Sequence, residues 1–267
     1  MVGLCIKRLF LYCVLFLSCS FTSCKAANKK SIRGSLSSLD SSLQPRITAY
    51  RERMRDLVKQ YPNLILCAET DKLVVALTFD DGPDTIITSQ ILDILEENKV
   101  KATFFVLGER VVQPQHQRIL ERCIQNNHEV LSHGWNHPRY STKTEVEIEH
   151  DIVTGEAALQ EKIGKHSPYM RPPYGDVDDR VINVLRKHEL QAILWSIDSL
   201  DSNASSSAEI ISDNVINNVM PGDIVIIHSR ETKEPTVAAL PIIIKNLCEQ
   251  GYRFVTVSEL LRIDGTV

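Results

Sequence analysis

Strand-like and helix-like segments alternate along the chain from Lys72 onward, and this alternation restricts the fold more than any other feature. The strand candidates are short, apolar and rich in β-branched residues, and they have no internal repeat in sequence. Strands are predicted at residues 73–79, 102–107, 129–132, 169–171, 192–197, 224–227 and 254–257. Helices are predicted between them at residues 86–98, 115–126, 143–163, 179–187, 208–218 and 237–250. Such alternation predicts a parallel α/β architecture.

Polar motifs follow nearly every predicted strand. The first is Thr-Phe-Asp-Asp-Gly-Pro at residues 78–83, and the second is His-Gly-Trp-Asn-His at residues 133–137. In parallel α/β folds the chemistry gathers at the carboxyl ends of the strands. Because the motifs recur from strand to strand, a barrel is favoured over an open sheet. No glycine-rich phosphate fingerprint occurs, which counts against a dinucleotide-binding fold.

The first two motifs contain the residue types of a metal centre. Two histidines and an aspartate form a ligand set for a divalent metal that keeps open positions. Adjacent strand residues point to opposite sides, so Asp80 and Asp81 are expected to have different roles. A carboxylate beside such a metal can accept a proton from water. Taken alone, either motif is more often a polar turn or a surface pair, so the functional interpretation depends on their shared position at strand ends.

Further polar motifs follow the later strands. They are Arg-Pro-Pro-Tyr-Gly at residues 171–175, Asp-Ser-Leu-Asp at 198–201, Ile-Ile-His at 226–228 and Val-Ser-Glu-Leu at 257–260. The first three, together with the two motifs above and in this order, resemble the five motifs of the polysaccharide deacetylases. That group is carbohydrate esterase family 4, with the deacetylase homology domain first recognised in nodulation proteins. The resemblance covers about residues 72 to 260 and implies a distorted (β/α)7 barrel.

The resemblance also implies how the first two motifs divide the chemistry. Asp81, His133 and His137 resemble the ligands of a divalent metal, for which zinc is the first expectation and cobalt, nickel or manganese are compatible. Asp80 resembles the general base, which takes a proton from the water that attacks the acetamide carbonyl. The same comparison assigns no other cofactor.

The later motifs resemble the remaining catalytic groups. Arg171 resembles the partner that orients the base and keeps it ionised, since a nearby cation lowers the pKa of a carboxylate. Tyr174 resembles the residue whose backbone N–H stabilises the tetrahedral oxyanion. His228 resembles the general acid that protonates the departing amine, and Asp198 the carboxylate that keeps it charged. Asp198 and Asp201 could instead cap the helix that follows.

Three residues depart from the family pattern. Gly134 stands where the family usually has Ser or Thr to brace the loop, so the metal geometry is expected to be looser. Ser202 stands where a Trp wall of the substrate groove is usual, and Ile226 where Leu is usual. The catalytic set is complete, whereas the substrate-binding set is not standard.

The N-terminal quarter of the chain is different in composition. Residues 1–24 are predicted to be a signal peptide or lipoprotein signal, because Lys7 and Arg8 precede an apolar stretch too short for a comfortable membrane span. Lipidation of Cys24, cleavage near Ala26 or Ala27 and an uncleaved anchor remain alternatives. Residues 25–71 are predicted to be a tether and a short helix, and residues 72–267 the catalytic domain.

Three cysteines lie after the predicted signal at residues 1–24, namely Cys67, Cys123 and Cys248. Their wide spacing argues against a structural zinc site. Buried free thiols are favoured over a single disulfide.

The expected function is metal-dependent N-deacetylation of N-acetylhexosamine in an extracytoplasmic polysaccharide, peptidoglycan first, with release of acetate. The location would be secreted, periplasmic or anchored as a lipoprotein, with membrane contact only through the N-terminus. A net charge of -4 argues against a nucleic-acid partner. The alternatives are a catalytically inactive glycan-binding protein that retains the fold, and an amidohydrolase of small cyclic amides.

Overall fold

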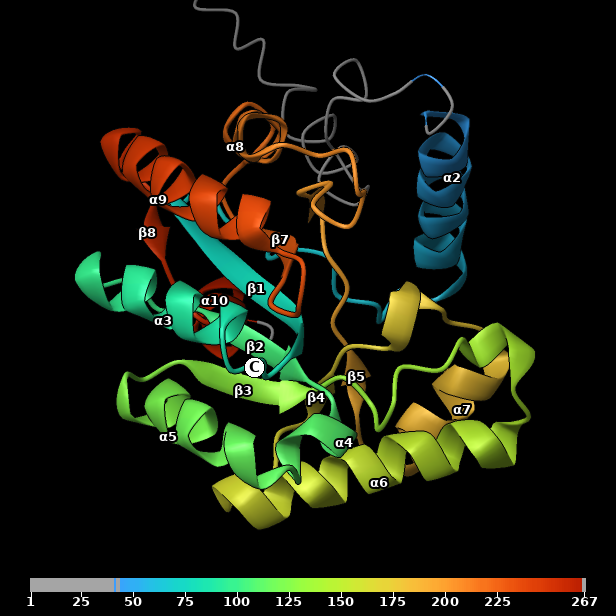
Figure 1. The fold of residues 1–267 in the computed structure, drawn as a ribbon. Coiled ribbons are helices and arrows are strands. Elements are labelled where there is room, and N and C mark those ends of the chain that lie inside the picture. The colour runs from blue at the N-terminus through green and yellow to red at the C-terminus, as the bar shows by residue number, and fades with distance from the viewer. Residues whose placement is uncertain (1–40, 42–43, 266–267) are drawn as a thin grey trace, which may run out of the picture.

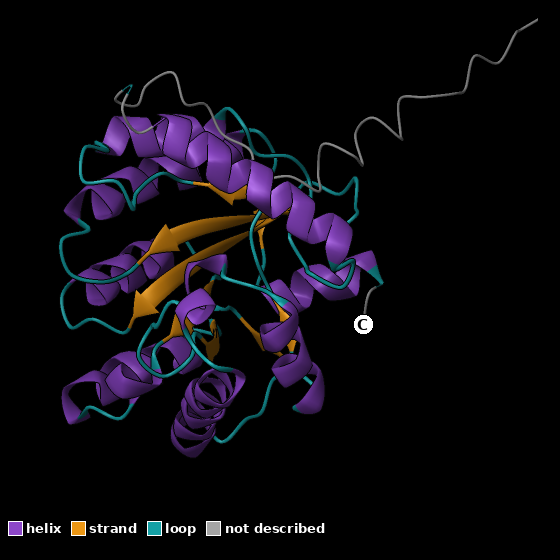
Figure 2. Cartoon of the chain, turned by 90° about the vertical axis from the view of Figure 1, so that its right-hand side faces the viewer, coloured by secondary structure: helices purple, strands orange, loops and turns teal. Residues whose placement is uncertain are grey.

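A computed structural model describes residue 41 and residues 44–265 of the chain. Their strands form one parallel sheet in the order β5-β4-β3-β2-β1-β7-β6, with β8 paired to β1. The strands are β1 Val74–Gly82, β2 Thr103–Val106, β3 Glu129–Ser132, β4 Tyr169–Met170, β5 Gln191–Ala192, β6 Ile197–Asp198, β7 Asp223–His228 and β8 Arg253–Phe254. The strands lie in the middle of the molecule and the helices outside them (Figures 1 and 2). The predicted barrel-type parallel α/β fold is confirmed.

The helices follow the predicted alternation. They are α2 Gln44–Gln60, α3 Ile87–Glu97, α4 Gly108–Val111, α5 Gln117–Gln125, α6 Glu145–Ile163, α7 Asp179–Lys187, α8 Ala208–Ile216, α9 Glu234–Glu249 and α10 Val257–Asp264. Single 3-10 turns lie at Pro114–His116, Tyr140–Thr142 and Pro173–Gly175. The predicted last strand at residues 254–257 was wrong at its end. Thr256 and Glu259 form a capping box there, which stops the strand and begins α10.

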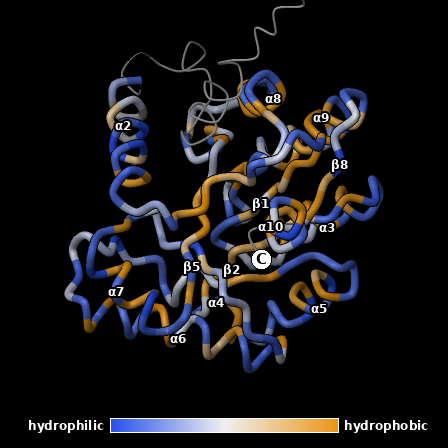
Figure 3. The backbone as a smooth tube through the Cα atoms, turned by 180° about the vertical axis from the view of Figure 1, so that it is seen from behind, coloured by the Kyte–Doolittle hydropathy of each residue, from blue (hydrophilic) through white to orange (hydrophobic). Residues whose placement is uncertain are grey.

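The apolar strands separate two cores. On β1, Ala76 lies in the core inside the curved sheet, whereas its neighbours Val75 and Leu77 lie in the core between the sheet and the outer helices. Strand β7 alternates in the same way. Both faces of these strands are therefore apolar, which explains why their sequences are continuous rather than alternating. Figure 3 shows hydrophobic residues toward the middle of the molecule and hydrophilic residues in the outer loops.

The predicted strand at residues 192–197 is broken in two. Strand β5 ends at Ala192 and β6 begins at Ile197. Between them, the Ile193 and Leu194 carbonyl oxygens accept hydrogen bonds from the buried Arg171 side chain, at 3.1 and 2.8 Å. A side chain thus takes the place of a neighbouring strand across this gap.

The segment before β1 fills the rest of the gap. Ile65 donates a backbone hydrogen bond to Ala192 and accepts one from Leu194, and Ala68 donates one to Gly222 beside β7. The segment around residues 64–66 therefore packs on the domain. It joins the two sides of the open sheet.

The packed unit begins before Lys72. Met54 and Leu57 of α2 and Leu64 and Leu66 of the following segment are buried in the core inside the sheet. The predicted boundary at residue 72 therefore marks where the motifs begin and not where the packing begins. The predicted signal and Cys24 lie outside the described residues.

Two further observations concern the described part of the chain. None of its helices has the length and apolar character needed to cross a membrane. Cys67, Cys123 and Cys248 are free thiols, of which only Cys123 is buried. Burial raises the pKa of the Cys123 thiol to about 12, so it is an inert apolar side chain.

Candidate active site

A β-bulge at the end of β1 brings its two aspartates to the same place. Strand β1 pairs with β2 at Asp80 and again at Gly82, and skips Asp81, whose φ is 70°. The expectation that adjacent strand residues face opposite sides fails here, because the bulge turns the second carboxylate back. The His133 Nε2 atom lies 3.7 Å from Asp80 Oδ2 and 3.5 Å from Asp81 Oδ1. Asp tolerates this backbone conformation better than most residues.

Asp81, His133 and His137 form a cluster that can hold a metal ion. One ligand atom from each lies within 4.8 Å of the others, and Asp81 Oδ1 is 3.3 Å from His137 Nε2. The Asp81 Oδ1 atom is buried and has no hydrogen-bond partner. A buried carboxylate oxygen with no donor, facing two imidazole nitrogens, is what a divalent cation would satisfy. The residues therefore fit the expected metal.

The protonation of the cluster suits a cation. His133 Nδ1 lies 2.7 Å from the Arg171 carbonyl oxygen, which can only accept, so Nδ1 carries a proton and Nε2 is the atom that faces Asp81. Burial, with the charge of His133, lowers the pKa of His137 to about 3, so its ring is neutral at pH 7. Burial alone would raise the pKa of Asp81, but the neighbouring histidines hold it well below its usual range. The site thus presents one carboxylate, a neutral His137 imidazole and the Nε2 atom of His133.

Arg171 is fully buried and holds Asp80. Its Nη1 donates to Asp80 Oδ1 at 2.6 Å and to Thr78 Oγ1 at 2.8 Å. Its guanidinium also lies over the Phe105 ring, 4.0 Å from the ring centre. The side chain also donates to the Ile193 and Leu194 carbonyl oxygens, so all of these contacts together hold it in one position. The structure therefore places a fixed positive charge against the predicted base, as expected for Arg171.

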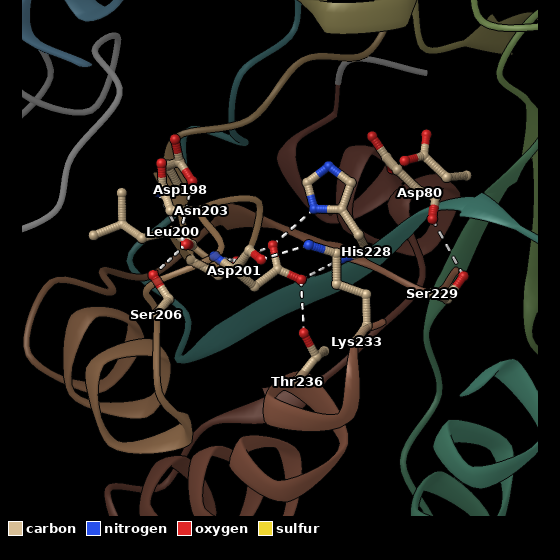
Figure 4. A network of polar contacts seen from close by, with 12 residues as sticks. Asp80, Asp198, Leu200, Asp201, Asn203, Ser206, His228, Ser229, Lys233 and Thr236 are labelled. Atoms are coloured by element: carbon tan, nitrogen blue, oxygen red, sulfur yellow. Dashed lines mark hydrogen bonds and ion pairs between the residues drawn. The ribbon is translucent and has the colours of Figure 1, made fainter. Parts of the chain in front are cut away.

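The carboxylate that binds His228 is Asp201, and the expectation for Asp198 was wrong. Asp201 Oδ1 is 2.7 Å from His228 Nδ1, and its Oδ2 accepts from the His228 backbone N–H at 2.8 Å and from Thr236 Oγ1 at 2.8 Å (Figure 4). Asp198 instead accepts from the Leu200 backbone N–H at 2.8 Å. Leu200 has a φ of 67°, so the chain reverses there and presents the second aspartate of the motif to the histidine.

His228 is charged at neutral pH. Burial by itself lowers its pKa, but the charge and hydrogen bond of Asp201 raise it to about 9. The pKa of Asp201 is lowered by the same partner against the effect of burial. Burial raises the pKa of Asp198, which has no such hydrogen bond. His228 also lies opposite Asp80 in the register of β7 and β1. A carboxylate that is bound to an arginine and a protonated imidazole therefore lie on neighbouring strands.

Tyr174 lies at the rim of the site. Its side chain is 44% exposed, and its ring centre is 4.3 Å from that of His137. The Arg139 guanidinium lies over the Tyr174 ring, 4.1 Å from the ring centre. Tyr174 has a φ of 59° within the 3-10 turn at Pro173–Gly175. The expected role of its N–H in stabilising an oxyanion stays a prediction.

The loop that carries both histidines is braced by Asp151, which sequence reasoning missed. Asp151 accepts from the backbone N–H groups of Trp135 and Asn136, at 3.1 and 3.2 Å, and from the Tyr140 hydroxyl at 2.8 Å. A Cβ on Gly134 would lie 2.3 Å from Asp151 Oδ2. The carboxylate thus fills the space that a side chain at residue 134 would occupy. The available signal was a charged residue on the apolar face of a predicted helix.

We expect Gly134→Ser to weaken metal binding rather than restore a missing brace. The new side chain would displace Asp151 and the loop between the two histidines, with a loss of affinity on the order of tenfold or more. Titration of the metal-free protein with zinc or cobalt measures this. Gly164→Ser is the matched control, because Gly164 also has a positive φ, of 67°, but open space around its Cβ position. Equal affinity in the two variants would contradict the prediction.

The other two departures have different surroundings. Ile226 is buried in the core inside the sheet, so it shapes the interior below the site. Ser202 is exposed, next to Asp201. Arg230, which sequence reasoning also missed, lies 2.9 Å from Asp81 Oδ2 through its Nε.

Comparisons with known proteins agree with this geometry. The polysaccharide deacetylase family profile matches residues 68–193. A peptidoglycan-N-acetylglucosamine deacetylase of Bacillus cereus is 40% identical over 192 residues, which cover 71% of this chain and 88% of that protein. One from Listeria monocytogenes is 33% identical over 88% of this chain, which spans only 47% of that longer protein. A crystal structure of a peptidoglycan N-acetylglucosamine deacetylase superposes with a TM-score of 0.71, at 33% identity, over 77% of this chain and 95% of that one.

Proposed function

Since the chain belongs to the polysaccharide deacetylase family, we propose that it hydrolyses the acetamide of N-acetylhexosamine units in a polysaccharide and releases acetate. The observation that carries this proposal is the buried Asp81 oxygen facing two imidazole nitrogens, next to a second carboxylate gripped by an arginine. Hydrolysis of an unactivated amide needs a general base, a general acid and an electrophile. The described residues supply the first two and a place for the third.

Asp80 is the proposed general base. Arg171 donates to one oxygen of this carboxylate at 2.6 Å and leaves the other oxygen facing His133, at 3.7 Å. Asp81, His133 and His137 would hold a divalent ion. Such an ion, when bound, polarises the substrate carbonyl and makes a nearby water more acidic. The chain's own contribution is to orient that chemistry and to take up the proton.

His228 is the proposed general acid. Asp201 keeps its ring protonated, so it can give a proton to the nitrogen of the leaving amine. Asp80 and His228 therefore meet the substrate in opposite protonation states, each set by a neighbour of opposite charge. The proposed role of Asp198 is now to shape the turn that carries Asp201.

Peptidoglycan is the proposed polymer, because relatives that are 40% and 33% identical to this chain are named for deacetylation of its sugars. The proposed location is outside the cytoplasmic membrane, reached through the predicted signal at residues 1–24. Zinc is the proposed metal on the ligand set of two histidines and one aspartate. The alternative of an inactive glycan-binding protein is not favoured, because every expected catalytic residue type is present at the site.

Acetate release from peptidoglycan and from N-acetylglucosamine oligomers tests the proposal. We expect release to stop after treatment with a chelator and to return when zinc or cobalt is added alone. The purified protein without residues 1–24 serves for this assay, and acetate is measured enzymatically. Metal-dependent release from one substrate supports both the reaction and the polymer class. No release from either substrate by a protein that binds metal would contradict the proposal.

A further inference from the structure

Arg230 brings a partly exposed cation to the edge of the metal cluster. Its Nε lies 2.9 Å from Asp81 Oδ2, while 43% of its side chain is exposed. Asp81 is its only ion-pair partner among the described residues, and this contact uses Nε. Neither Nη group has a hydrogen bond to another residue in the described part of the chain. A guanidinium so placed keeps one fork of parallel donors available.

Its neighbours in sequence hold the backbone of Arg230 in place. Ser229 donates from its N–H to the Asp80 carbonyl oxygen at 2.9 Å, and its own carbonyl accepts from the Thr88 hydroxyl at 2.8 Å. Glu231 forms a two-point ion pair with Arg110, at 2.9 and 2.8 Å. The cation is thus carried on a short segment anchored on both sides. Such anchoring reduces the ordering cost of binding a charged group.

The charge balance of the site explains what this cation is free to bind. Three of the carboxylates at the site each have a cationic partner of their own. The pairs are Asp80 with Arg171 at 2.6 Å, Asp81 with Arg230 at 2.9 Å and Asp201 with His228 at 2.7 Å. A bound divalent ion would therefore add positive charge that these three paired carboxylates do not offset. The exposed end of the site favours an anion.

We propose that Arg230 is a specificity-determining residue that binds a carboxylate on the sugar whose acetamide is hydrolysed, through its two Nη groups. The guanidinium contacts the ligand aspartate, so the carboxylate it reaches must lie close to the acetamide. An acidic ether on the ring carbon next to the acetamide, as in N-acetylmuramic acid, meets this requirement. The inference rests on the proposed deacetylation and narrows its substrate to acid-bearing amino sugars.

The test compares substrates that differ only in charge. The probes are a glycan oligomer with free N-acetylmuramic acid carboxylates and the same oligomer with these groups converted to primary amides. For the unmodified protein we expect kcat/KM to be about tenfold higher on the acid, the factor that corresponds to about 1.4 kcal/mol. Arg230→Gln is expected to bring this ratio close to one, and Arg230→Lys to keep part of it. The ratio does not depend on metal occupancy, because both substrates meet the same enzyme preparation.

Arg253→Gln is the matched control for total charge. Arg253 is exposed on β8, which pairs with the first residues of β1, at the end of the strand away from Asp80. This variant should keep the ratio of the unmodified protein. An oligomer whose reacting sugar is N-acetylglucosamine, with the acid only on the neighbouring sugar, separates recognition of the reacting ring from recognition along the chain. A preference seen only with that oligomer would overturn the assignment to the reacting sugar.

A binding measurement separates failure of this inference from failure of the proposed reaction. Calorimetry with the Asp80→Asn protein, with and without Arg230→Gln, gives the Kd of each oligomer when turnover is blocked. Tighter binding of the acid than of the amide, lost with Arg230→Gln, supports the inference even if no acetate is ever released. Equal Kd values for acid and amide, or a preference that survives Arg230→Gln, would overturn it. Acetate release from both oligomers at equal rates would support the proposed reaction but would show that Arg230 does not determine its substrate specificity.

Discussion

Asp80→Asn is expected to lower kcat for acetate release by about a thousandfold or more, within the range assigned to a positioned general base. The amide has the shape of the carboxylate and can still accept from Arg171, which donates at 2.6 Å in the unmodified protein. It cannot take up a proton. The loss should appear in kcat rather than in KM, because the change removes an interaction that matters only as the reaction proceeds.

Metal content decides whether that loss reflects the base. Asp80→Asn should bind a stoichiometric divalent ion, because the three ligands are unchanged. His133→Ala should lose both metal and turnover, since it removes the nitrogen that faces Asp81 at 3.5 Å. Inductively coupled plasma measurements on dialysed protein provide the comparison. If Asp80→Asn turned over at the rate of the unmodified protein, Asp80 would not be the base.

Asp201→Asn is expected to move the alkaline limit of activity to lower pH. Burial lowers the pKa of His228, and the charge of Asp201 is the main effect that raises it to about 9. The acid must be protonated to serve the leaving amine, so activity falls as pH rises through the pKa of His228. Without Asp201 the pKa drops and the proton is lost earlier. At about pH 8 we expect kcat/KM to fall on the order of a hundredfold, a typical contribution of acid catalysis.

The pH profile of kcat/KM for both proteins, loaded with the same metal, measures this shift. A bound divalent ion opposes protonation of His228 in both proteins, so the difference between the profiles is the quantity to compare. Stability gives a second measure. The folded pKa is raised, so the pair stabilises the fold below the ordinary histidine pKa of 6.5, and this contribution is lost as pH rises through about 9. If the unmodified protein and Asp201→Asn had the same alkaline limit, the pair of Asp201 and His228 would not control the proton that the leaving amine receives.

Asp198→Asn is the matched control for the Asp201 variant. Both changes remove one carboxylate from the same four-residue motif, but only Asp201 contacts the His228 ring. Asp198→Asn keeps an oxygen that can accept from the Leu200 N–H. Its alkaline limit should therefore stay close to that of the unmodified protein.

Periodicity and turn residues predicted most of the elements. Helix α7 and strand β3 have the predicted bounds. The break between β5 and β6 was not predictable from residues 192–197, which are apolar and strand-like throughout. It depends on carbonyl groups that pair with Arg171 and Ile65, both distant in sequence. Long-range hydrogen bonding of this kind has no local signal.

The motifs identified the right residue types at the site, but local backbone geometry decided their partners. Asp81 joins the histidines through a bulge, and Leu200 turns the chain so that Asp201 rather than Asp198 meets His228. Both depend on positive φ angles at residues other than glycine, which sequence seldom reveals. Asp151 was missed for a related reason. The two backbone N–H groups and the tyrosine hydroxyl that donate to it lie in the segment before its helix.

The gap between β5 and β6 couples the start of the chain to its catalytic chemistry. The same short stretch, Ala192 to Leu194, is bound on one side by Ile65 and on the other by the arginine that orients Asp80. A fragment cut at Lys72, where the motifs begin, would leave this stretch paired on one side only. Such a fragment would lose turnover before it lost its secondary structure. An expression boundary chosen by sequence motif would therefore remove part of the packing that supports the catalytic arginine.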